Sequence, residues 1–267
     1  MSATLQFDDE ASKRLEACYT TPDVALQRTN VLSALDLRSG ERVLDVGSGP
    51  GFLALTMADA VGPSGSVCAI DPSESMVAMM RTRCADRVWV EARVGESDTL
   101  PYSDCAFDVV VATQVLEYVA DVKKSLHEAF RVLRLGGRFL ALDTDWDSIV
   151  WHSTDRSRMA RVLNAWEEHL INPRLPRTLA SLLKTTGFVL QRQEVIPLLN
   201  TEYNNNTYSY GLAGLITRFV PTRKGIDYDE VALWAKDLET LGEMGAYFFN
   251  LSRYLFLAMK PKILTNR

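Results

Sequence analysis

The sequence contains little of what several common classes of site require. Its four cysteines and three histidines form neither a CxxC pair nor an HExxH motif, and no GxSxG motif occurs. Runs of about 18 apolar residues, the length of a membrane span, are also missing. Zinc sites, dithiol centres and serine hydrolase triads therefore have no support. We expect reduced structural cysteines, no metal, no membrane association and, because the first residues lack a signal-peptide pattern, a cytoplasmic protein.

A surplus of basic residues is missing as well. The chain has 29 Lys and Arg against 34 Asp and Glu, a net charge of −5. Because nucleic acid is bound mainly through excess cations, we do not expect it as a partner. With 47% hydrophobic residues, the chain has the composition of a globular protein with a full core. The expected partner is a small molecule, bound by a monomer or a homodimer.

Strand-like and helix-like segments alternate over the first two thirds of the chain. Predicted strands cover 42–46, 67–70, 88–94, 107–112 and 138–143, and predicted helices begin at 22, 52, 74 and 122. Thr21, Ser73 and Asp121 stand at N-cap positions of three of these helices. Repeated strand-helix units in one direction predict an α/β fold with a doubly wound, mostly parallel sheet.

The pattern changes after residue 143. Residues 145–175 are mixed helical with no sheet pattern, and the Asn- and Tyr-rich segment 201–210 has a loop composition. Pro176 and Gly187 bracket a further helix, and another is predicted around Trp234. Strands over 188–196 and 247–259 complete the predicted sheet.

The most informative segment is Val43-Leu-Asp-Val-Gly-Ser-Gly-Pro-Gly-Phe52, which joins the first strand to its helix. Glycines at 47, 49 and 51 let the backbone turn sharply and approach a ligand closely, because no Cβ intervenes. A dinucleotide fingerprint, GxGxxG, would need its third glycine where Phe52 stands. Taken alone, the loop is also compatible with an ordinary glycine-rich turn.

This loop resembles the first motif, V-L-D-x-G-x-G-x-G, of class I S-adenosylmethionine-dependent methyltransferases. Asp71, at the end of the second strand, stands where that family places an acid that holds the ribose. Further motifs of the family match, in order, Gly95-Glu-Ser-Asp-Thr-Leu-Pro-Tyr-Ser-Asp-Cys-Ala-Phe-Asp108, Thr113-Gln-Val-Leu-Glu-Tyr118 and Arg131-Val-Leu-Arg-Leu-Gly-Gly137. The resemblance covers roughly residues 40–145. The chain is similar in particular to the small-molecule enzymes of the quinone-methylating subgroup.

The resemblance implies a Rossmann-like, doubly wound, mostly parallel sheet of seven strands, with helical insertions that cap the active site. It also implies S-adenosyl-L-methionine as the cofactor. We expect a single domain over residues 1–267. Its parts are an N-terminal helical lid (1–40), a cofactor-binding core (41–144), acceptor-side cap insertions (145–175 and 200–245) and the last strands (188–199 and 247–259).

The resemblance further implies which residues hold the cofactor. Asp71 would accept hydrogen bonds from both ribose hydroxyls; its alternative role is to cap the following helix. Glu96, where the family usually has Asp, and the Ser97 amide would contact the adenine. Asp45 either orients the amino-acid end of the cofactor or holds the glycine turn. The whole predicted set is Asp45, Gly47, Ser48, Gly49, Gly51, Asp71, Pro72, Met76, Glu96, Ser97, Thr113 and Gln114.

Methyl transfer from a sulfonium is an in-line displacement that needs neither a metal nor a covalent nucleophile. Holding the acceptor about 3–3.5 Å from the methyl group supplies much of the acceleration. A base is needed only when the attacking atom starts protonated. The candidate catalytic residues are His152, after the fifth strand, and Tyr19, before the first helix; a surface or packed histidine is the alternative for His152. Tyr118 stands where relatives often have His.

The expected acceptor is small and aromatic or heterocyclic, with attack by O, N or C. Four aromatic residues are candidates for the acceptor pocket, with core packing as the alternative for each: Trp146, Trp151, Tyr203 and Tyr208. Three other functions stay open. They are a quinone-precursor C-methyltransferase, a non-catalytic protein that binds S-adenosylmethionine and, more distantly, a nicotinamide-dependent oxidoreductase.

Overall fold

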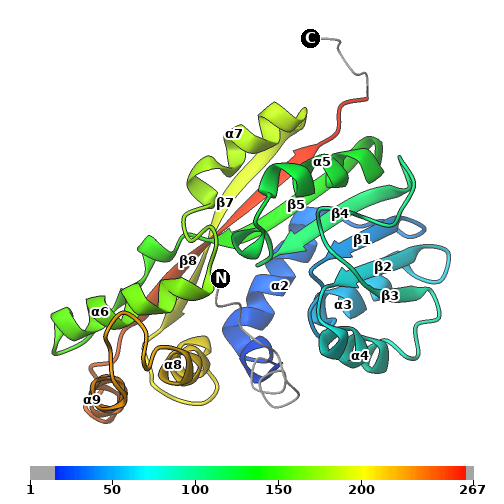
Figure 1. Ribbon diagram of the computed structural model, residues 1–267. Helices are drawn as coiled ribbons and strands as arrows, with labels where there is room; N and C mark the ends of the chain where they lie inside the picture. Colours follow the sequence, from blue (N-terminus) through cyan, green and yellow to red (C-terminus); the bar gives the residue numbers. More distant parts are fainter. Residues whose placement is uncertain (1–15, 263–267) are drawn as a thin grey trace.

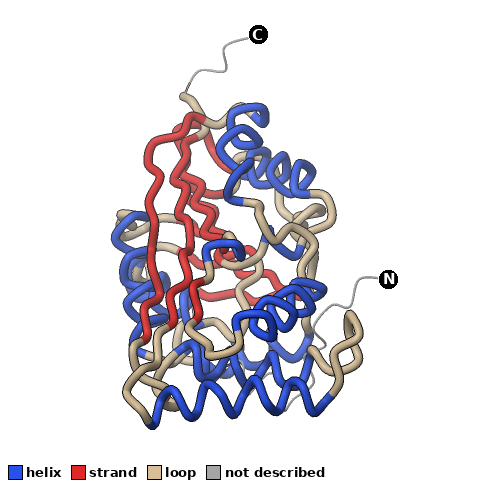
Figure 2. The backbone as a smooth tube through the Cα atoms, turned by 90° about the vertical axis from the view of Figure 1, so that its left-hand side faces the viewer, coloured by secondary structure: helices blue, strands red, loops and turns tan. Residues whose placement is uncertain are grey.

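The computed structural model describes residues 16–262, in which one twisted sheet has helices on both faces (Figures 1 and 2). The strands are β1 (Arg42–Val46), β2 (Ser66–Asp71), β3 (Val90–Val94), β4 (Phe107–Thr113), β5 (Leu133–Thr144), β6 (Val150–Trp151), β7 (Val189–Asn200) and β8 (Phe249–Met259). The α-helices are α2 (Pro22–Leu35), α3 (Phe52–Val61), α4 (Glu74–Arg83), α5 (Val122–Val132), α6 (Arg156–Trp166), α7 (Pro176–Thr186), α8 (Tyr208–Phe219) and α9 (Tyr228–Glu243). Short 3-10 helices are η1 (Leu116–Tyr118), η2 (Trp146–Ser148) and η3 (Glu167–His169).

The sheet runs in the order β3-β2-β1-β4-β5-β8, and β7 pairs with the other edge of β8. Strands β1 to β5 are mutually parallel, whereas β8 is antiparallel to both β5 and β7. The strand order reverses between β1 and β4. In open α/β sheets such a switch point leaves a crevice beyond the carboxyl ends of the strands, which is where ligands bind.

The predicted α/β sheet is confirmed. Strand β5 begins at Leu133 rather than at 138, and further differences lie after residue 143. Residues 150–151 form the short strand β6 on β8, inside a segment predicted to have no sheet pattern. This strand is an eighth member of the sheet and makes only two residue pairs. The predicted loop over 201–210 is too long, because α8 begins at Tyr208. The apolar residues Leu212, Ile216 and Phe219 of α8 follow helical spacing and are buried. Tertiary packing therefore extends this helix into the Tyr-rich segment.

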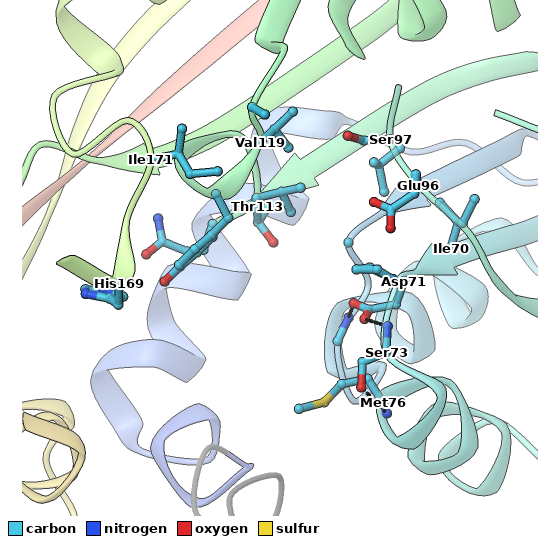
Figure 3. Close-up of a pocket in the computed structure, with 18 of the residues that line it drawn as sticks. Ile70, Asp71, Ser73, Met76, Glu96, Ser97, Thr113, Val119, His169 and Ile171 are labelled. Atoms are coloured by element: carbon cyan, nitrogen blue, oxygen red, sulfur yellow. Dashed lines mark hydrogen bonds between the residues drawn. The ribbon is translucent and has the colours of Figure 1, made fainter. Parts of the chain in front are cut away.

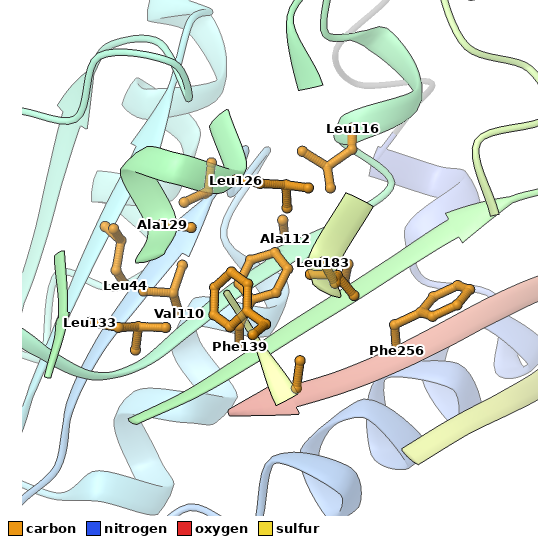
Figure 4. Packing of buried hydrophobic residues seen from close by; sticks show 14 of the residues in the cluster. Leu44, Val110, Ala112, Leu116, Leu126, Ala129, Leu133, Phe139, Leu183 and Phe256 are labelled. Carbon is orange, nitrogen blue, oxygen red and sulfur yellow. The ribbon is translucent and has the colours of Figure 1, made fainter. Parts of the chain in front are cut away.

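Apolar side chains from both faces of the sheet form two cores. One packs α5 and α7 against the sheet, with Leu126, Leu183 and Phe139 at its centre (Figure 4). The other packs α2, α3 and α4 against the opposite face, where Met57 and Met80 are fully buried. Helices on both faces explain why β4 is buried along almost its whole length.

A third apolar cluster joins α6, α8 and α9 to the ends of β7 and β8. Trp234 of α9 is fully buried in it, edge-on to Trp151 of β6. In Figure 1 these three helices gather at one end of the molecule, away from β1 to β3. We call them the cap. Within the described chain no helix has the length and apolarity of a membrane span. Of the predicted lid, 1–15 lie outside the described residues.

Candidate active site

The cavity that brings the predicted motifs together has a volume of about 710 Å³ and lies at the carboxyl ends of β1, β2 and β4. In Figure 3, Asp71 and Glu96 lie on one side of it and His169 on the opposite side. The predicted site residues that line it are Tyr19, Gly47, Gly49, Asp71, Pro72, Met76, Glu96, Ser97, Thr113 and Gln114. The predicted residues outside this lining are Asp45, Ser48, Gly51 and His152.

The glycine loop has a left-handed backbone, which explains its composition. Gly47 and Gly49 have φ values of 65° and 52°, a region that residues with a Cβ seldom adopt. A Cβ on Gly47 would lie 2.3 Å from Val115 Cγ2, so the close approach of the segment after β4 also demands glycine. Around Gly49 no heavy atom lies within 4 Å of the corresponding position. Gly49 therefore offers bare backbone to the cavity.

Asp71 joins this loop to the next helix. Its Oδ2 accepts a hydrogen bond from Gly49 N at 2.8 Å, and its Oδ1 accepts one from Ser73 N at 2.9 Å. Burial raises its pKa, and these two amide bonds oppose that rise. A carboxylate has about four lone-pair sites, so two remain for a ligand in the cavity. The structural role and the ligand-binding role predicted for Asp71 are therefore compatible.

Asp45, Ser48 and Gly51 support the loop from behind. Asp45 is only 1% exposed, and its Oδ2 has no hydrogen-bond partner among the described residues. Burial, with a smaller contribution from the charge of Asp71, raises the pKa of Asp45 to about 8. Ser48 Oγ donates to Met80 Sδ at 3.3 Å, and Gly51 is the N-cap of α3.

Glu96 and Ser97 follow β3 and line the cavity beside Asp71. Ser97 Oγ lies 2.8 Å from Ser125 Oγ on α5, which holds this segment against the helix. The Glu96 side chain is exposed and faces the same cavity (Figure 3). An exposed carboxylate can accept hydrogen bonds from an amine of a ligand.

Gln114 follows β4 in a conformation that a non-glycine residue rarely adopts, with φ at 57°. Its backbone nitrogen donates to Leu142 O at 2.6 Å, and its side-chain Oε1 accepts from Thr144 Oγ1 at 2.8 Å. These bonds to β5 hold the strained residue in place. Non-glycine residues held in this region gather at functional sites, and Gln114 lines the cavity.

The half of the cavity opposite the glycine loop is aromatic. The aromatic residues that line it are Tyr118 of η1, Trp146 of η2, Trp166 of α6, His169 of η3 and Tyr208 of α8. Tyr19 also lines the cavity but lies near the glycine loop, with its ring centroid 6.4 Å from that of Phe52. Two other candidates for this pocket do not reach it. Trp151 is buried in the cap cluster, where its Nε1 donates to Tyr247 Oη at 3.0 Å, and Tyr203 packs on Tyr247 with ring centroids 5.2 Å apart.

His152, the predicted catalytic histidine, does not lie at this cavity. It directly follows β6, in which Val150 is exposed and Trp151 is buried. Successive side chains of an extended segment point to opposite sides, so His152 is turned outward again and its side chain is exposed. The structure therefore corrects this prediction, in favour of the surface histidine that was its alternative.

The histidine that does line the cavity is His169 in η3. Its Nδ1 is hydrogen-bonded to Trp166 O, and its ring lies on Trp166 with centroids 3.8 Å apart. Burial lowers its pKa to about 4, so the ring is neutral at pH 7. Sequence reasoning missed it because a single histidine at a helix end has no motif around it.

Arg253 is the second lining residue that the sequence did not reveal. It lies on β8, is 3% exposed, and donates through Nη1 to Gln27 Oε1 of α2. Its alternating neighbours Leu251 and Leu255 are apolar, so the strand pattern indicated core. Only the tertiary fold brings this residue to the cavity.

Two buried acids brace the turn after β4. Asp143 Oδ1 accepts from Val115 N at 3.1 Å, and Glu117 Oε2 accepts from Thr144 N at 3.2 Å. Burial raises the pKa of Glu117 to about 7, and raises that of Asp143 well above its ordinary range. Neither lines the cavity, so we interpret both as supports of the segment that does.

Comparisons with known proteins agree with this geometry. Residues 44–141 match the family described as "Methyltransferase domain". A demethylmenaquinone methyltransferase of Symbiobacterium thermophilum is 30% identical over 175 residues, which cover 57% of this chain and 70% of that protein. An uncharacterized 37.1 kDa protein in transposon TN4556 of Streptomyces fradiae is 38% identical over 195 residues, covering 71% of this chain and 54% of that protein. The chain spans about half the length of several of the curated relatives it matches.

A solved structure shares the fold. Haemonchus contortus phosphoethanolamine N-methyltransferase 2, in complex with S-adenosyl-L-methionine, superposes with a TM-score of 0.63 at 20% identity. The match covers 96% of this chain and 58% of that protein. The Symbiobacterium relative, of which 70% is covered, is thus a methyltransferase, as the fold and the glycine loop indicate for this chain. The chain belongs to the class I S-adenosylmethionine-dependent methyltransferases, whose cofactor is S-adenosyl-L-methionine.

Proposed function

We propose that the chain transfers a methyl group from S-adenosyl-L-methionine to a small aromatic or heterocyclic acceptor, at O, N or C. The observation that carries this proposal is the continuity of one cavity, which joins the glycine loop and Asp71 to an aromatic chamber. Its volume of about 710 Å³ lies within the range of about 300–1,000 Å³ that is common for small-molecule sites. The half beside the glycine loop can take the cofactor, and the aromatic half can take the acceptor.

The loop-side residues fit the cofactor. The bare backbone at Gly49 leaves room for its amino-acid end, and Asp71 retains lone pairs for the ribose hydroxyls. Glu96 and the amide of Ser97 would contact the adenine. When bound, the cofactor supplies a methyl group on a positively charged sulfur. The chain's own residues then have to hold the acceptor in line with that group and keep water out.

The aromatic residues would position the acceptor. Burial raises the pKa of the Tyr19 hydroxyl, so at pH 7 it stays protonated and donates hydrogen bonds rather than acting as a base. His169 is neutral, and its Nε2 has no hydrogen-bond partner among the described residues. If the attacking atom of the acceptor starts protonated, His169 is the histidine available at the cavity to accept the proton.

Calorimetry with S-adenosylmethionine and with NAD tests the cofactor. We expect binding of the first only; binding of NAD alone would overturn the proposal. Asp71→Ala should weaken cofactor binding tenfold to a few hundredfold, because one charge-assisted hydrogen bond contributes about 1.5–3 kcal/mol. Asp86→Ala, at an exposed position outside the cavity lining, is the matched control. Equal affinities of the two variants would assign Asp71 a structural role only.

A screen of small acceptors, read out as S-adenosylhomocysteine formed, tests the reaction. Aromatic and heterocyclic acceptors should raise the product above the control without acceptor. The screen should include a demethylated naphthoquinone, because the Symbiobacterium relative is named a demethylmenaquinone methyltransferase. Turnover of that compound alone would favour the quinone-precursor alternative, and binding without turnover of any acceptor would favour a non-catalytic protein.

A further inference from the structure

The charges that line the cavity are unevenly distributed. On the loop side the charged residues of the described lining are all acids, namely Asp71, Glu96, Asp98 and Asp121. In the aromatic half the only charged residue is Arg253, since His169 is neutral at pH 7. Arg253 is also the only lysine or arginine in the whole described lining. A ligand that reaches the aromatic half therefore meets one buried positive charge.

The charge of Arg253 has no ion-pair partner in the described part of the chain. Its Nη1 donates to Gln27, its guanidinium carbon lies 4.7 Å from the ring centroid of Tyr208, and its Nε has no hydrogen-bond partner. Burial raises the pKa of Glu117, and the charge of Arg253 opposes that rise without a salt bridge between the two side chains. Removing a charge from water costs several kcal/mol unless it is paired. The position of Arg253 is thus suited to an anion.

Arg253 contacts elements other than the cofactor loop. Its contacts, Gln27 and Tyr208, come from α2 and α8 rather than from the loop after β1. Tyr208 lines the aromatic half of the cavity with Trp146 and Trp166. A planar ring can stack against these side chains, while a carboxylate matches the planar fork of a guanidinium.

We propose that Arg253 binds a carboxylate of the acceptor, so that the substrate of this chain is an aromatic or heterocyclic acid. The inference rests on the proposed function, because it assigns the acceptor of that same site. A second source of a carboxylate is the amino-acid end of the cofactor itself. The test below distinguishes these two sources.

Matched pairs of aromatic acids and their amides test the proposal without catalysis. Benzoate with benzamide, and quinoline-2-carboxylate with its amide, are titrated by calorimetry into protein saturated with S-adenosylhomocysteine. We expect each acid to bind tenfold to a few hundredfold more tightly than its amide, the range for a hydrogen bond between charged groups. Equal binding of acid and amide, or binding of neither, overturns the proposal.

Arg253→Gln should abolish the preference for acids and leave the affinity for S-adenosylhomocysteine within about threefold. Arg223→Gln is the control, because Arg223 also lies over an aromatic ring, 3.8 Å from Phe219, but outside the cavity lining. A loss of S-adenosylhomocysteine affinity with the preference for acids intact would assign Arg253 to the cofactor and overturn the proposal.

Circular dichroism shows whether Arg253→Gln folds. If it does not, Arg253→Lys keeps the charge but not the fork and should retain part of the preference. The comparison of acid with amide in the unmodified protein decides in any case. Failure of the unmodified protein to bind S-adenosylhomocysteine would contradict the proposed function, which is a separate outcome.

Discussion

At the scale of single residues, two glycines of the same loop are required for different reasons. Both have positive φ, but only Gly47 also meets a neighbour, because Val115 Cγ2 lies 2.3 Å from the point that a Cβ would occupy. Gly49→Ala should cost about 1–2 kcal/mol for the left-handed backbone alone. Gly47→Ala should cost about 2–5 kcal/mol, because overpacking adds about 1–3 kcal/mol. Denaturant unfolding of the two variants measures the difference.

Val115→Ala provides the control for this prediction. Removing the valine methyl groups removes the two closest contacts of the new Cβ, so most of the overpacking cost should disappear from the Gly47→Ala, Val115→Ala double variant. The remaining cost is mainly that of the backbone conformation. A double-mutant cycle without any coupling between the two positions would contradict this account.

Asp45 should make the stability of the protein depend on pH. Its pKa of about 8 in the folded protein lies above its ordinary value of 3.8, so the folded state keeps a proton that the unfolded state releases. The stability that Asp45 contributes therefore falls as the pH rises from about 4 to about 8. Asp45→Asn removes this dependence, and its advantage over the unmodified protein should grow by at least about 1.4 kcal/mol between pH 5 and pH 8.

Urea unfolding of both proteins at a series of pH values measures this effect. Asp86→Asn, at an exposed position, should leave the pH dependence of stability unchanged. If Asp45→Asn were destabilising by the same amount at every pH, the carboxyl group would be interpreted as a hydrogen-bonding support of the turn instead.

Which site residues could be predicted depends on whether their signal is local. Gly47, Gly49 and Asp71 belong to short motifs in which neighbouring residues constrain one another, and all three line the cavity. His169 and Arg253 have no such neighbours. Their place in the cavity lining depends on packing against segments far away in the sequence; Arg253, for example, donates a hydrogen bond to Gln27.

At the scale of elements, capping residues fix where helices begin. Asp227 accepts a hydrogen bond from Glu230 N at 2.8 Å at the start of α9, the helix that buries Trp234 in the cap. Asp227→Ala should cost about 1 kcal/mol, within the range of about 0.5–2 kcal/mol for lost N-caps. Asp229→Ala removes an acid from the same helical turn without removing a cap bond. Thermal unfolding of the pair should therefore show the larger loss for Asp227→Ala.

The same local signals explain which elements could be predicted. Helices α4 and α5 have N-caps that accept hydrogen bonds, Ser73 and Asp121, and both were predicted from these residues. Strand β6 has two residues and no pattern of its own, since it exists by pairing with Asn250 and Phe249. The start of α8 is set by burial of its apolar face, which overrides the loop-like composition before it.

At the scale of the whole molecule, the cavity depends on parts that are distant in sequence. The loop after β1 provides one wall, and Tyr208 and Arg253 of α8 and β8 provide the other. A ligand that contacts both halves binds the folded state and not the unfolded chain. Ligand binding should therefore stabilise the molecule as a whole rather than the loop alone.

This coupling leads to a prediction for thermal unfolding. At a concentration of one hundred times its Kd, S-adenosylmethionine should add about 2.7 kcal/mol to the free energy of unfolding. For a domain of this size, about 2–4 °C per kcal/mol is expected, so the midpoint should rise by about 5–11 °C. NAD at the same concentration should leave it unchanged. A comparable rise with Asp71→Ala at the same ligand concentration would mean that the Asp71 carboxylate does not bind the ligand and only holds Gly49 of the loop.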